Sequence, residues 1–199
     1  IGMDLIVKLP LTKNGNTSVL VVTDSLSKMA KFIATRETIS AEETAKLVFD
    51  RVFSQFGLPN SIISDQDPRF TSNFWSELHR IMNVQLMMAT AYHHQTNGQT
   101  ERLNRTLEEM LRHYVNHKQN DWDEHLPILE FAYNSAVNKS TQKTPFELVF
   151  GYNLRLDYGQ FLDADQPSLK DHTRRVKENI ELAKQAIAKA QAEAKERYD

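Results

Sequence analysis

A change in hydrophobic period along the first sixty residues constrains the fold of this chain more than any other feature. Three strand-like runs come first, at residues 1–9, 18–23 and 30–35, and short links join them. Apolar residues then recur with helical spacing, and Ser40 with Glu43 forms the capping-box pattern that opens a helix. Strands on short links predict an antiparallel meander, and the change to a helical period predicts a switch to alternating strands and helices.

The remaining pattern alternates between short apolar strands and helices. After residue 40 we expect a helix to about residue 56, a strand at 61–64, a helix capped by Thr71 or Ser72, a strand at 84–88, a polar loop at 92–98, a long helix to about residue 118, a helix from Asp121 and a short helix after Thr144. Four residues should share the core face of the first helix: Ala45, Val48, Val52 and Phe56. The order predicts an α/β domain with a mixed five-stranded sheet flanked by helices.

The regular pattern of strands and helices ends after residue 155. We expect a domain at residues 1–155, an irregular linker at 156–167 and a charged, alanine-rich helix at 168–199. Apolar residues recur along this C-terminal helix at alternating spacings of four and three, which is typical of a seam for a partner helix. A spacer helix whose weak stripe packs on its own domain explains the pattern equally well.

Composition excludes several classes of protein. Cysteine is absent, so disulfides and thiolate zinc sites are excluded. No run of about 20 apolar residues suits a membrane span, and no signal peptide is visible. The chain opens without a starting methionine, which is the pattern expected of a processed product or of a piece cut from a longer chain. The net charge of −2 decides little, because basic residues cluster locally and a site built from carboxylates would lower the total.

Three acidic residues carry the strongest chemical signal. Asp65 follows the short buried strand at 61–64, where open α/β sheets place their ligand sites. Glu101 is expected in the first turn or so of the long helix, where the helix dipole favours an ionised carboxylate. Asp4 interrupts an apolar strand, which is costly unless the acid is paired or binds a cation. Together the three would suit a hard divalent cation, Mg²⁺ or Mn²⁺.

The amino-acid sequence around these acids resembles the integrase catalytic core of gypsy-class LTR retrotransposons. The resemblance covers residues 1–155, and its motifs are IGMDLI, ISDQDPRFTSNFW, TAYHHQTNGQTERLNRTLEEMLR, DWDEHLPILEFAYN and KTPFELVFG. Thirty-five residues separate Asp65 from Glu101, as in the Asp-Asp-35-Glu signature of that family. The spacing alone would be a weak signal, but the spacing together with the flanking sequence motifs is highly specific.

The resemblance implies a fold, a site and an activity. It implies a ribonuclease-H-like fold in which Asp4, Asp65 and Glu101 hold two Mg²⁺ or Mn²⁺ ions when DNA is bound. It also implies 3′-end processing of element DNA followed by strand transfer into target DNA. The implied partners are double-stranded DNA and, in the full-length enzyme, further copies of the chain, and the implied location is the nucleus. Positions that match DNA-contacting residues of the family are Tyr92, Asn97, Gln99, Asn104 and Arg105.

Departures from the family pattern leave alternatives open. His94 stands where the family usually has Pro, and Asn97 where it usually has Asp, which puts the level of activity in doubt. The family's N-terminal zinc-binding and C-terminal DNA-binding segments are expected to be missing, and the helix at 168–199 would lead towards the latter. A domesticated or inactive core that acts as an assembly module is one alternative. Another is a transposase or nuclease of the same fold.

Other polar residues have simpler interpretations. Asp24 ends the strand at 18–23 and rivals Asp4 as the first acid, but a turn role is expected for it. Asp67, before Pro68, is expected to be a turn acceptor. His113 and His117 would lie one helical turn apart, a spacing that zinc can use, although no third ligand is evident.

Overall fold

A computed structural model of the chain describes residues 1–65, 67–82, 84–88 and 94–154, together with positions 174, 178, 181, 182 and 185. The expected linker at 156–167 lies outside the described residues, as does the expected C-terminal helix apart from those five positions. None of the described helices is both long and apolar enough to cross a membrane.

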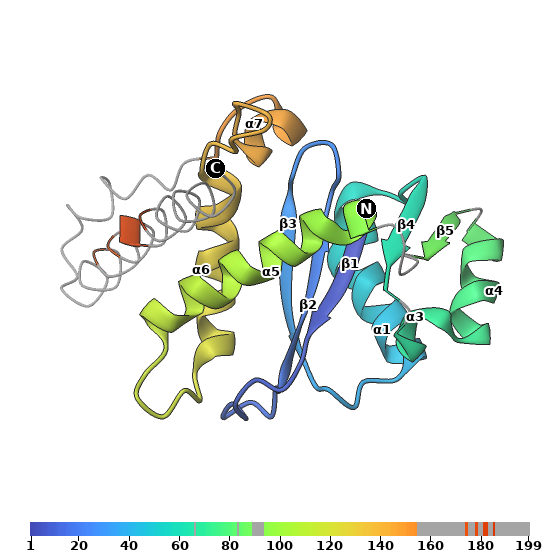
Figure 1. Cartoon of the computed structure of the whole chain (residues 1–199), viewed down its shortest axis with the longest axis horizontal. Helices are drawn as coiled ribbons and strands as arrows, with labels where there is room; N and C mark the ends of the chain where they lie inside the picture. Colours follow the sequence, from blue (N-terminus) through green and yellow to red (C-terminus); the bar gives the residue numbers. More distant parts are fainter. Residues whose placement is uncertain are drawn as a thin grey trace.

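The strands form one mixed, five-stranded sheet, as the sequence predicts, and the structure gives its strand order as β3-β2-β1-β4-β5 (Figure 1). They are β1 (Gly2–Ile6), β2 (Ser18–Thr23), β3 (Ala30–Thr35), β4 (Ser61–Ser64) and β5 (Gln85–Met88). The first three pair antiparallel, whereas β4 runs parallel to both β1 and β5. Parallel pairing places the carboxyl ends of β1 and β4 at the same edge of the sheet, where α/β folds build their sites.

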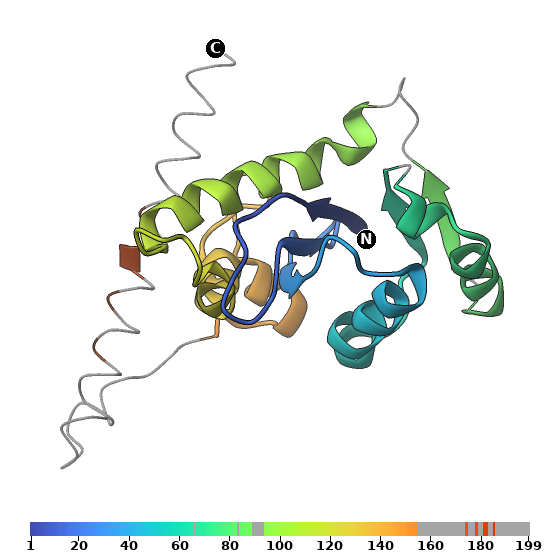
Figure 2. The same cartoon turned by 90° about the horizontal axis from the view of Figure 1, so that it is seen from below.

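Helices cover both faces of the sheet (Figures 1 and 2). They are α1 (Ala41–Val48), η1 (Phe49–Phe53), α2 (Ser54–Phe56), α3 (Pro68–Thr71), α4 (Asn73–Met82), α5 (His94–Tyr114), α6 (Trp122–Ser135) and α7 (Pro145–Phe150). One core lies between the sheet and α5 with α6, and it includes Val21, Leu107 and Trp122. The other lies between the sheet and α1, η1, α3 and α4, and it includes Val48 and Trp75.

The helix after residue 40 departs from its expected face. Ser40 and Glu43 form the predicted capping box, and Ala45, Val48 and Val52 are buried as expected. Residues Phe49–Phe53, however, form a π-helical turn, which adds a residue to the turn and shifts the positions that follow. Phe53 is therefore buried, and the expected core residue Phe56 is 40% exposed.

Both ends of the long helix α5 differ from the sequence prediction. The helix begins at His94, within the stretch expected to be a loop, because Gln99 anchors its first turns to β2. It ends at Tyr114 rather than near residue 118, and the backbone N–H of Asn116 donates instead to Asp121 Oδ1 at 3.1 Å. Local polarity suggested a loop where tertiary hydrogen bonds favour a helix.

Candidate metal and DNA-processing site

Asp4 lies in the middle of β1 and faces α5. Its neighbours Met3 and Leu5 belong to the opposite core, so strand alternation directs Asp4 to the α5 side of the sheet. The side-chain amide of Asn104, on α5, donates to Asp4 Oδ2 at 2.8 Å, and the backbone N–H of Leu5 donates to Oδ1 at 2.8 Å. Both carboxylate oxygens of this half-buried acid are therefore oriented by the fold.

The electrostatics of Asp4 connect it to the other two acids. The pKa of Asp4 is raised to about 6, chiefly by burial, and the negative charges of Asp65 and Glu101 contribute to the rise. Hydrogen bonds from Leu5 and Asn104 act in the opposite direction. The three acids thus share one electrostatic neighbourhood although they are distant in sequence.

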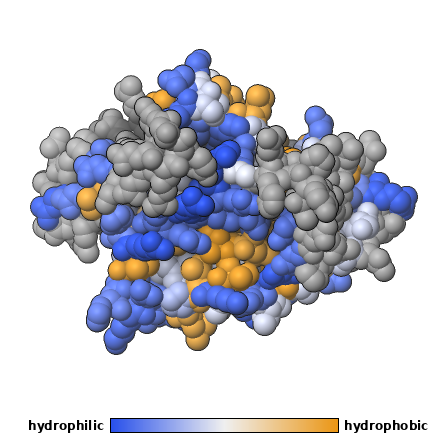
Figure 3. Space-filling view, viewed as in Figure 1, coloured by the Kyte–Doolittle hydropathy of each residue, from blue (hydrophilic) through white to orange (hydrophobic). Residues whose placement is uncertain are grey.

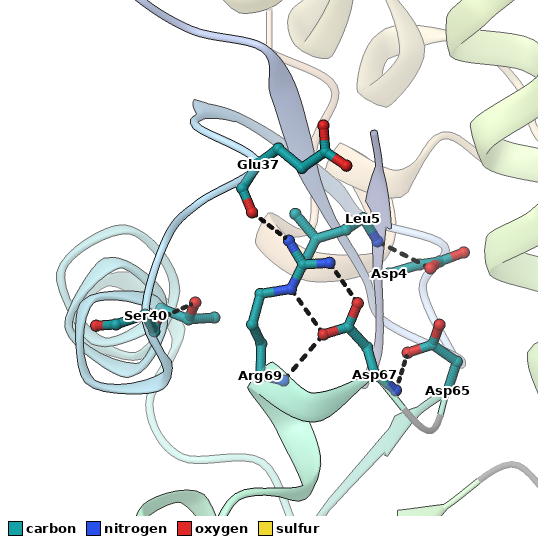
Figure 4. Close-up of polar contacts among 8 residues, drawn as sticks. Asp4, Leu5, Glu37, Ser40, Asp65, Asp67 and Arg69 are labelled. Carbon is teal, nitrogen blue, oxygen red and sulfur yellow. Dashed lines mark hydrogen bonds and ion pairs between the residues drawn. The ribbon is translucent and has the colours of Figure 1, made fainter. Parts of the chain in front are cut away.

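Asp65 comes directly after β4, beside β1. Met3 pairs with Ser64 in the parallel register, so each acid stands one residue beyond a paired position. The backbone N–H of Asp67 donates to Asp65 Oδ1 at 3.1 Å. Figure 4 shows the carboxyl groups of Asp4 and Asp65 near each other beside β1.

Glu101 lies more than one turn inside α5, not in its first turn as the sequence suggested. The helix begins at His94, so the helix-dipole argument for an ionised Glu101 is wrong, because that effect fades beyond the first turn. Close packing still brings the helix near the site, since a Cβ added at Gly2 would lie only 2.5 Å from Thr100 Oγ1. The Glu101 side chain is exposed. Figure 3 shows one face of the molecule, where the coloured surface is mostly hydrophilic, with a hydrophobic area near the centre and smaller ones towards the edges.

The residues present fit a divalent cation in part. Two half-buried carboxylates from adjacent strands repel each other, and a cation would remove that repulsion. Across the ranges that the structure describes, no three His, Asp or Glu side chains are grouped closely enough to hold a metal ion. Asp4 and Asp65 therefore form the core of the candidate site, and Glu101 would have to turn towards them.

The predicted DNA-binding residues have different surroundings. Gln99 accepts a hydrogen bond from Lys28 Nζ at 2.8 Å and donates to the Asp24 carbonyl at 3.2 Å, so its amide joins α5 to the turn after β2. Asn104 is engaged with Asp4, whereas Arg105 is exposed to solvent. Tyr92 lies outside the described residues.

Asn97 lies in the first turns of α5, as does His94, and the structure describes their backbones without their side chains. Their influence on DNA contact remains a prediction. Among the members of this group whose side chains the structure describes, Asn104 is the one hydrogen-bonded to an acid of the site.

Asp24 and Asp67 both have the turn roles expected of them. Asp24 Oδ2 accepts from the backbone N–H of Ser27 at 2.7 Å and from its hydroxyl at 2.6 Å. Burial alone would raise the pKa of Asp24, but these hydrogen bonds outweigh it and lower the pKa below its usual value. Asp67 caps α3 by accepting from the backbone N–H of Arg69.

The two histidines near the end of α5 do not share a helical face. His113 is in α5, but His117 lies beyond its last residue, Tyr114, so the expected i, i+4 pair is absent. Both side chains are exposed. The zinc alternative therefore loses the geometry on which it rested.

His79 supplies a prediction about stability and pH. This α4 residue is 4% exposed and packs edge-on against Trp75, with ring centroids 5.2 Å apart. Neither ring nitrogen has a partner among the described residues, and burial lowers the pKa of His79. Because the unfolded chain binds a proton near pH 6.5 and the folded chain resists it, His79 should reduce the free energy of unfolding as the pH falls below about 6.5.

Replacing His79 isolates this effect. Between pH 7.5 and 5.5, the free energy of unfolding of the wild type should fall by up to about 1 kcal/mol more than that of His79→Leu, as measured by urea denaturation. The comparison is needed because Asp4, with its raised pKa of about 6, contributes with the opposite sign as the pH falls. Equal pH dependence in the two proteins would contradict the prediction.

Comparisons with known proteins agree with this architecture. No family model matches the chain. The chain is 37% identical over 173 residues to the Tf2-3 polyprotein of Schizosaccharomyces pombe, a match that covers 87% of this chain and 12% of the polyprotein. The Tf2-4 polyprotein of the same organism matches to the same extent. The chain thus corresponds to about an eighth of these relatives' length.

Solved structures share its fold at low sequence identity. The bovine immunodeficiency virus (BIV) integrase catalytic core has a TM-score of 0.58 and 20% identity, covering 75% of this chain and 92% of that one. The HTLV-2 integrase catalytic core in complex with magnesium has a TM-score of 0.54 and 17% identity, covering 74% and 93%. A chain from the structure of the simian T-cell lymphotropic virus intasome in complex with PP2A regulatory subunit B56 gamma has a TM-score of 0.62 and 18% identity, covering 78% of this chain and 55% of that one. The chain is therefore homologous to the polyproteins of gypsy-class Tf2 retrotransposons, in a segment with the ribonuclease-H-like fold of retroviral integrase catalytic cores.

Proposed function

We propose that this segment is the catalytic core of a retrotransposon integrase that cuts and joins DNA with divalent cations. The observation that carries the proposal is that Asp4, in the middle of β1, lies beside Asp65, which directly follows the carboxyl end of the parallel strand β4, in a chain of this fold. Magnesium accompanies one structural neighbour, the HTLV-2 core, and oxygen-only ligands suit the same ion here. Asp4, Asp65 and Glu101 would hold two Mg²⁺ or Mn²⁺ ions.

The proposed chemistry comprises two displacements at phosphorus. In the first, a water oxygen attacks a phosphodiester near the end of the element DNA, the bond to the 3′ oxygen breaks, and that oxygen takes up a proton. In the second, this new 3′-hydroxyl attacks a phosphodiester of target DNA, forms a new P–O bond, and releases a target 3′-hydroxyl. Bound cations would lower the pKa of the attacking oxygen and stabilise the leaving one.

The protein's own residues position the reactants. Asn104 and the Leu5 backbone orient the two oxygens of Asp4, and the Asp67 backbone orients Asp65. Arg105 projects from the Glu101 face of α5 and would meet a DNA phosphate there. Tyr92, Asn97 and Gln99 would complete this contact, although the Gln99 amide would first have to leave the turn after β2.

The wider setting is part of the same proposal. The partners would be element ends and target DNA, in an assembly that contains further copies of the chain, and the site of action would be the nucleus. One neighbour is part of an intasome, and the HTLV-2 core is known in dimeric and trimeric forms. These assemblies of structural neighbours support the proposal that this chain also acts together with further copies of itself.

Removing divalent cations should eliminate joining. With duplex oligonucleotides carrying element ends, the 199-residue chain should form strand-transfer products in Mg²⁺ or Mn²⁺, and excess EDTA should reduce them by at least about 100-fold, because metal stabilisation of charge contributes several kcal/mol. Products are resolved on denaturing gels. An RNA–DNA hybrid serves as the control substrate, since preferential cleavage of the hybrid would favour a nuclease of the same fold.

One observation favours a second candidate. Glu101 is exposed, and among the described residues no third acid joins Asp4 and Asp65. A core in this state could hold DNA or partner chains without catalysis. A folded protein that binds DNA but yields no joined product in either metal would support this assembly-module function over the enzyme.

A further inference from the structure

An ion pair stands immediately beside the acids of the proposed site. Arg69 Nε donates to Asp67 Oδ1 at 2.6 Å, and Arg69 Nη2 donates to Asp67 Oδ2 (Figure 4). Both side chains are mostly enclosed, with 18% of Arg69 and 17% of Asp67 exposed. A two-pronged guanidinium–carboxylate contact of this kind is strong and fixes orientation as well as distance.

The pair is connected at both ends. Arg69 Nη1 donates to the carbonyl of Glu37 at 2.9 Å, which ties α3 to the segment between β3 and α1. On the other side, the Asp67 backbone N–H donates to Asp65 Oδ1 at 3.1 Å. Hydrogen bonding to Asp67 raises the pKa of Arg69 most, burial opposes this rise, and the charges of Asp67, Asp65 and Glu37 add to it.

Resting on the proposed function, we propose that Arg69 is a positioning residue that acts through Asp67 to hold Asp65 in the geometry needed to bind a cation. The clamp fixes the backbone of the turn after β4, and that backbone holds one oxygen of Asp65. Partners that orient a metal ligand typically change metal affinity by about 10- to 100-fold when removed. Arg69 would therefore control a site that it does not itself enter.

Helix capping is a separate role that the variants can distinguish. Asp67 caps α3 through the backbone N–H of Arg69, and that hydrogen bond does not depend on the Arg69 side chain. Arg69→Lys retains the positive charge and the cap but loses the fork. Arg69→Ala retains the cap but loses both the positive charge and the two-pronged contact with Asp67. A purely structural role predicts altered stability without a specific effect on Asp65.

The test measures Mn²⁺ binding by the 199-residue chain, with free Mn²⁺ followed by electron paramagnetic resonance. Arg69→Lys should raise the Mn²⁺ Kd about 10-fold, and Arg69→Ala up to about 100-fold, measured at a temperature well below the Tm of each variant, where circular dichroism shows that the fold is intact. The backbone amide of Asp67, observed by ¹⁵N NMR, should shift and lose hydrogen-exchange protection in both variants. Arg36→Ala is the matched control, because the Arg36–Glu43 pair is exposed and should leave both readouts unchanged.

The outcomes separate this inference from the proposed function. A wild-type Mn²⁺ Kd and an unshifted Asp67 amide in Arg69→Lys and Arg69→Ala, alongside weakened binding in Asp65→Asn, would overturn the clamp alone. Wild-type Mn²⁺ binding by Asp65→Asn would overturn the proposed metal site. In that case a shifted Asp67 amide in the Arg69 variants would still support the clamp on the turn.

Discussion

Asp65→Asn should abolish metal-dependent DNA joining while leaving the stability of the fold intact or slightly higher. The loss follows because a neutral amide is a poor ligand for Mg²⁺, and the proposed chemistry depends on the cation for several kcal/mol. We expect joining to fall by at least about 1000-fold in a strand-transfer assay. The fold should survive because asparagine has the same shape and can still accept the hydrogen bond from the Asp67 backbone.

Asp65→Asn is also expected to leave the thermal stability of the protein unchanged or slightly raised, whereas most substitutions lower it. Asp65 raises the pKa of Asp4 through like-charge repulsion, so removing its charge relieves an unfavourable interaction. Thermal unfolding at pH 7.5 without divalent cations should give a Tm equal to or above that of wild type. Addition of Mg²⁺ should then stabilise wild type more than Asp65→Asn, because only wild type retains the full ligand set.

Asp24→Asn provides the matched control. Asp24 also ends a strand and was the rival for the first acid, but its carboxylate is engaged with Ser27 in a turn. The variant should join DNA at a rate close to that of wild type. If Asp24→Asn loses joining and Asp65→Asn keeps it, the site has been assigned to the wrong acids.

Asn134→Ala should have the largest effect on stability among the polar substitutions considered. Asn134 lies in α6 and is 1% exposed. Its Oδ1 accepts from the Ala30 backbone N–H at 2.9 Å, and its Nδ2 donates to the Ala30 carbonyl at 2.8 Å. The side chain thus bonds both backbone groups of a residue in β3, the strand at the end of the sheet order.

Glu130, one turn earlier in α6, also bonds to the backbone of β3. Its Oε2 accepts from the backbone N–H of Phe32 at 2.8 Å, and its Oε1 pairs with Lys31 Nζ at 2.6 Å. An uncovered edge strand exposes hydrogen-bonding groups that can recruit another chain, so α6 acts here as a cover for β3.

Truncating Asn134 leaves two buried backbone groups of Ala30 without partners. Each such group costs about 1–3 kcal/mol, so the free energy of unfolding should fall by about 3 kcal/mol, measured by urea denaturation. Asn14→Ala is the control, because Asn14 is exposed and Asp123 Oδ2 keeps its bonds to Thr12 and Asn16, so the cost should stay within about 0.5 kcal/mol. An Asn134→Ala loss no larger than this control would show that β3 does not depend on the amide.

Interactions between residues close in sequence could be predicted without the structure. The strand and helix order, the five-stranded mixed sheet and the capping box at Ser40 follow from period and local chemistry, and so does the second capping box at Thr144–Glu147. The position of Asp65 just after β4 follows in the same way. The elements and their caps depend on hydrogen bonds and side-chain spacing within about four residues, which can be read from the sequence directly. The mixed sheet was inferred from the order of those elements, although its strands pair over longer separations.

The tertiary structure alone decided how distant segments meet. The π-helical turn at Phe49–Phe53 buries Phe53 in place of Phe56, and α5 begins at His94 because Gln99 bonds to β2. The bond from Asn104 to Asp4 joins residues 100 positions apart, and the bond from Asn134 to Ala30 joins residues 104 positions apart. Their partners become neighbours only when the two cores pack against the sheet, so the energy that selects them comes from packing and buried hydrogen bonds rather than from local propensity.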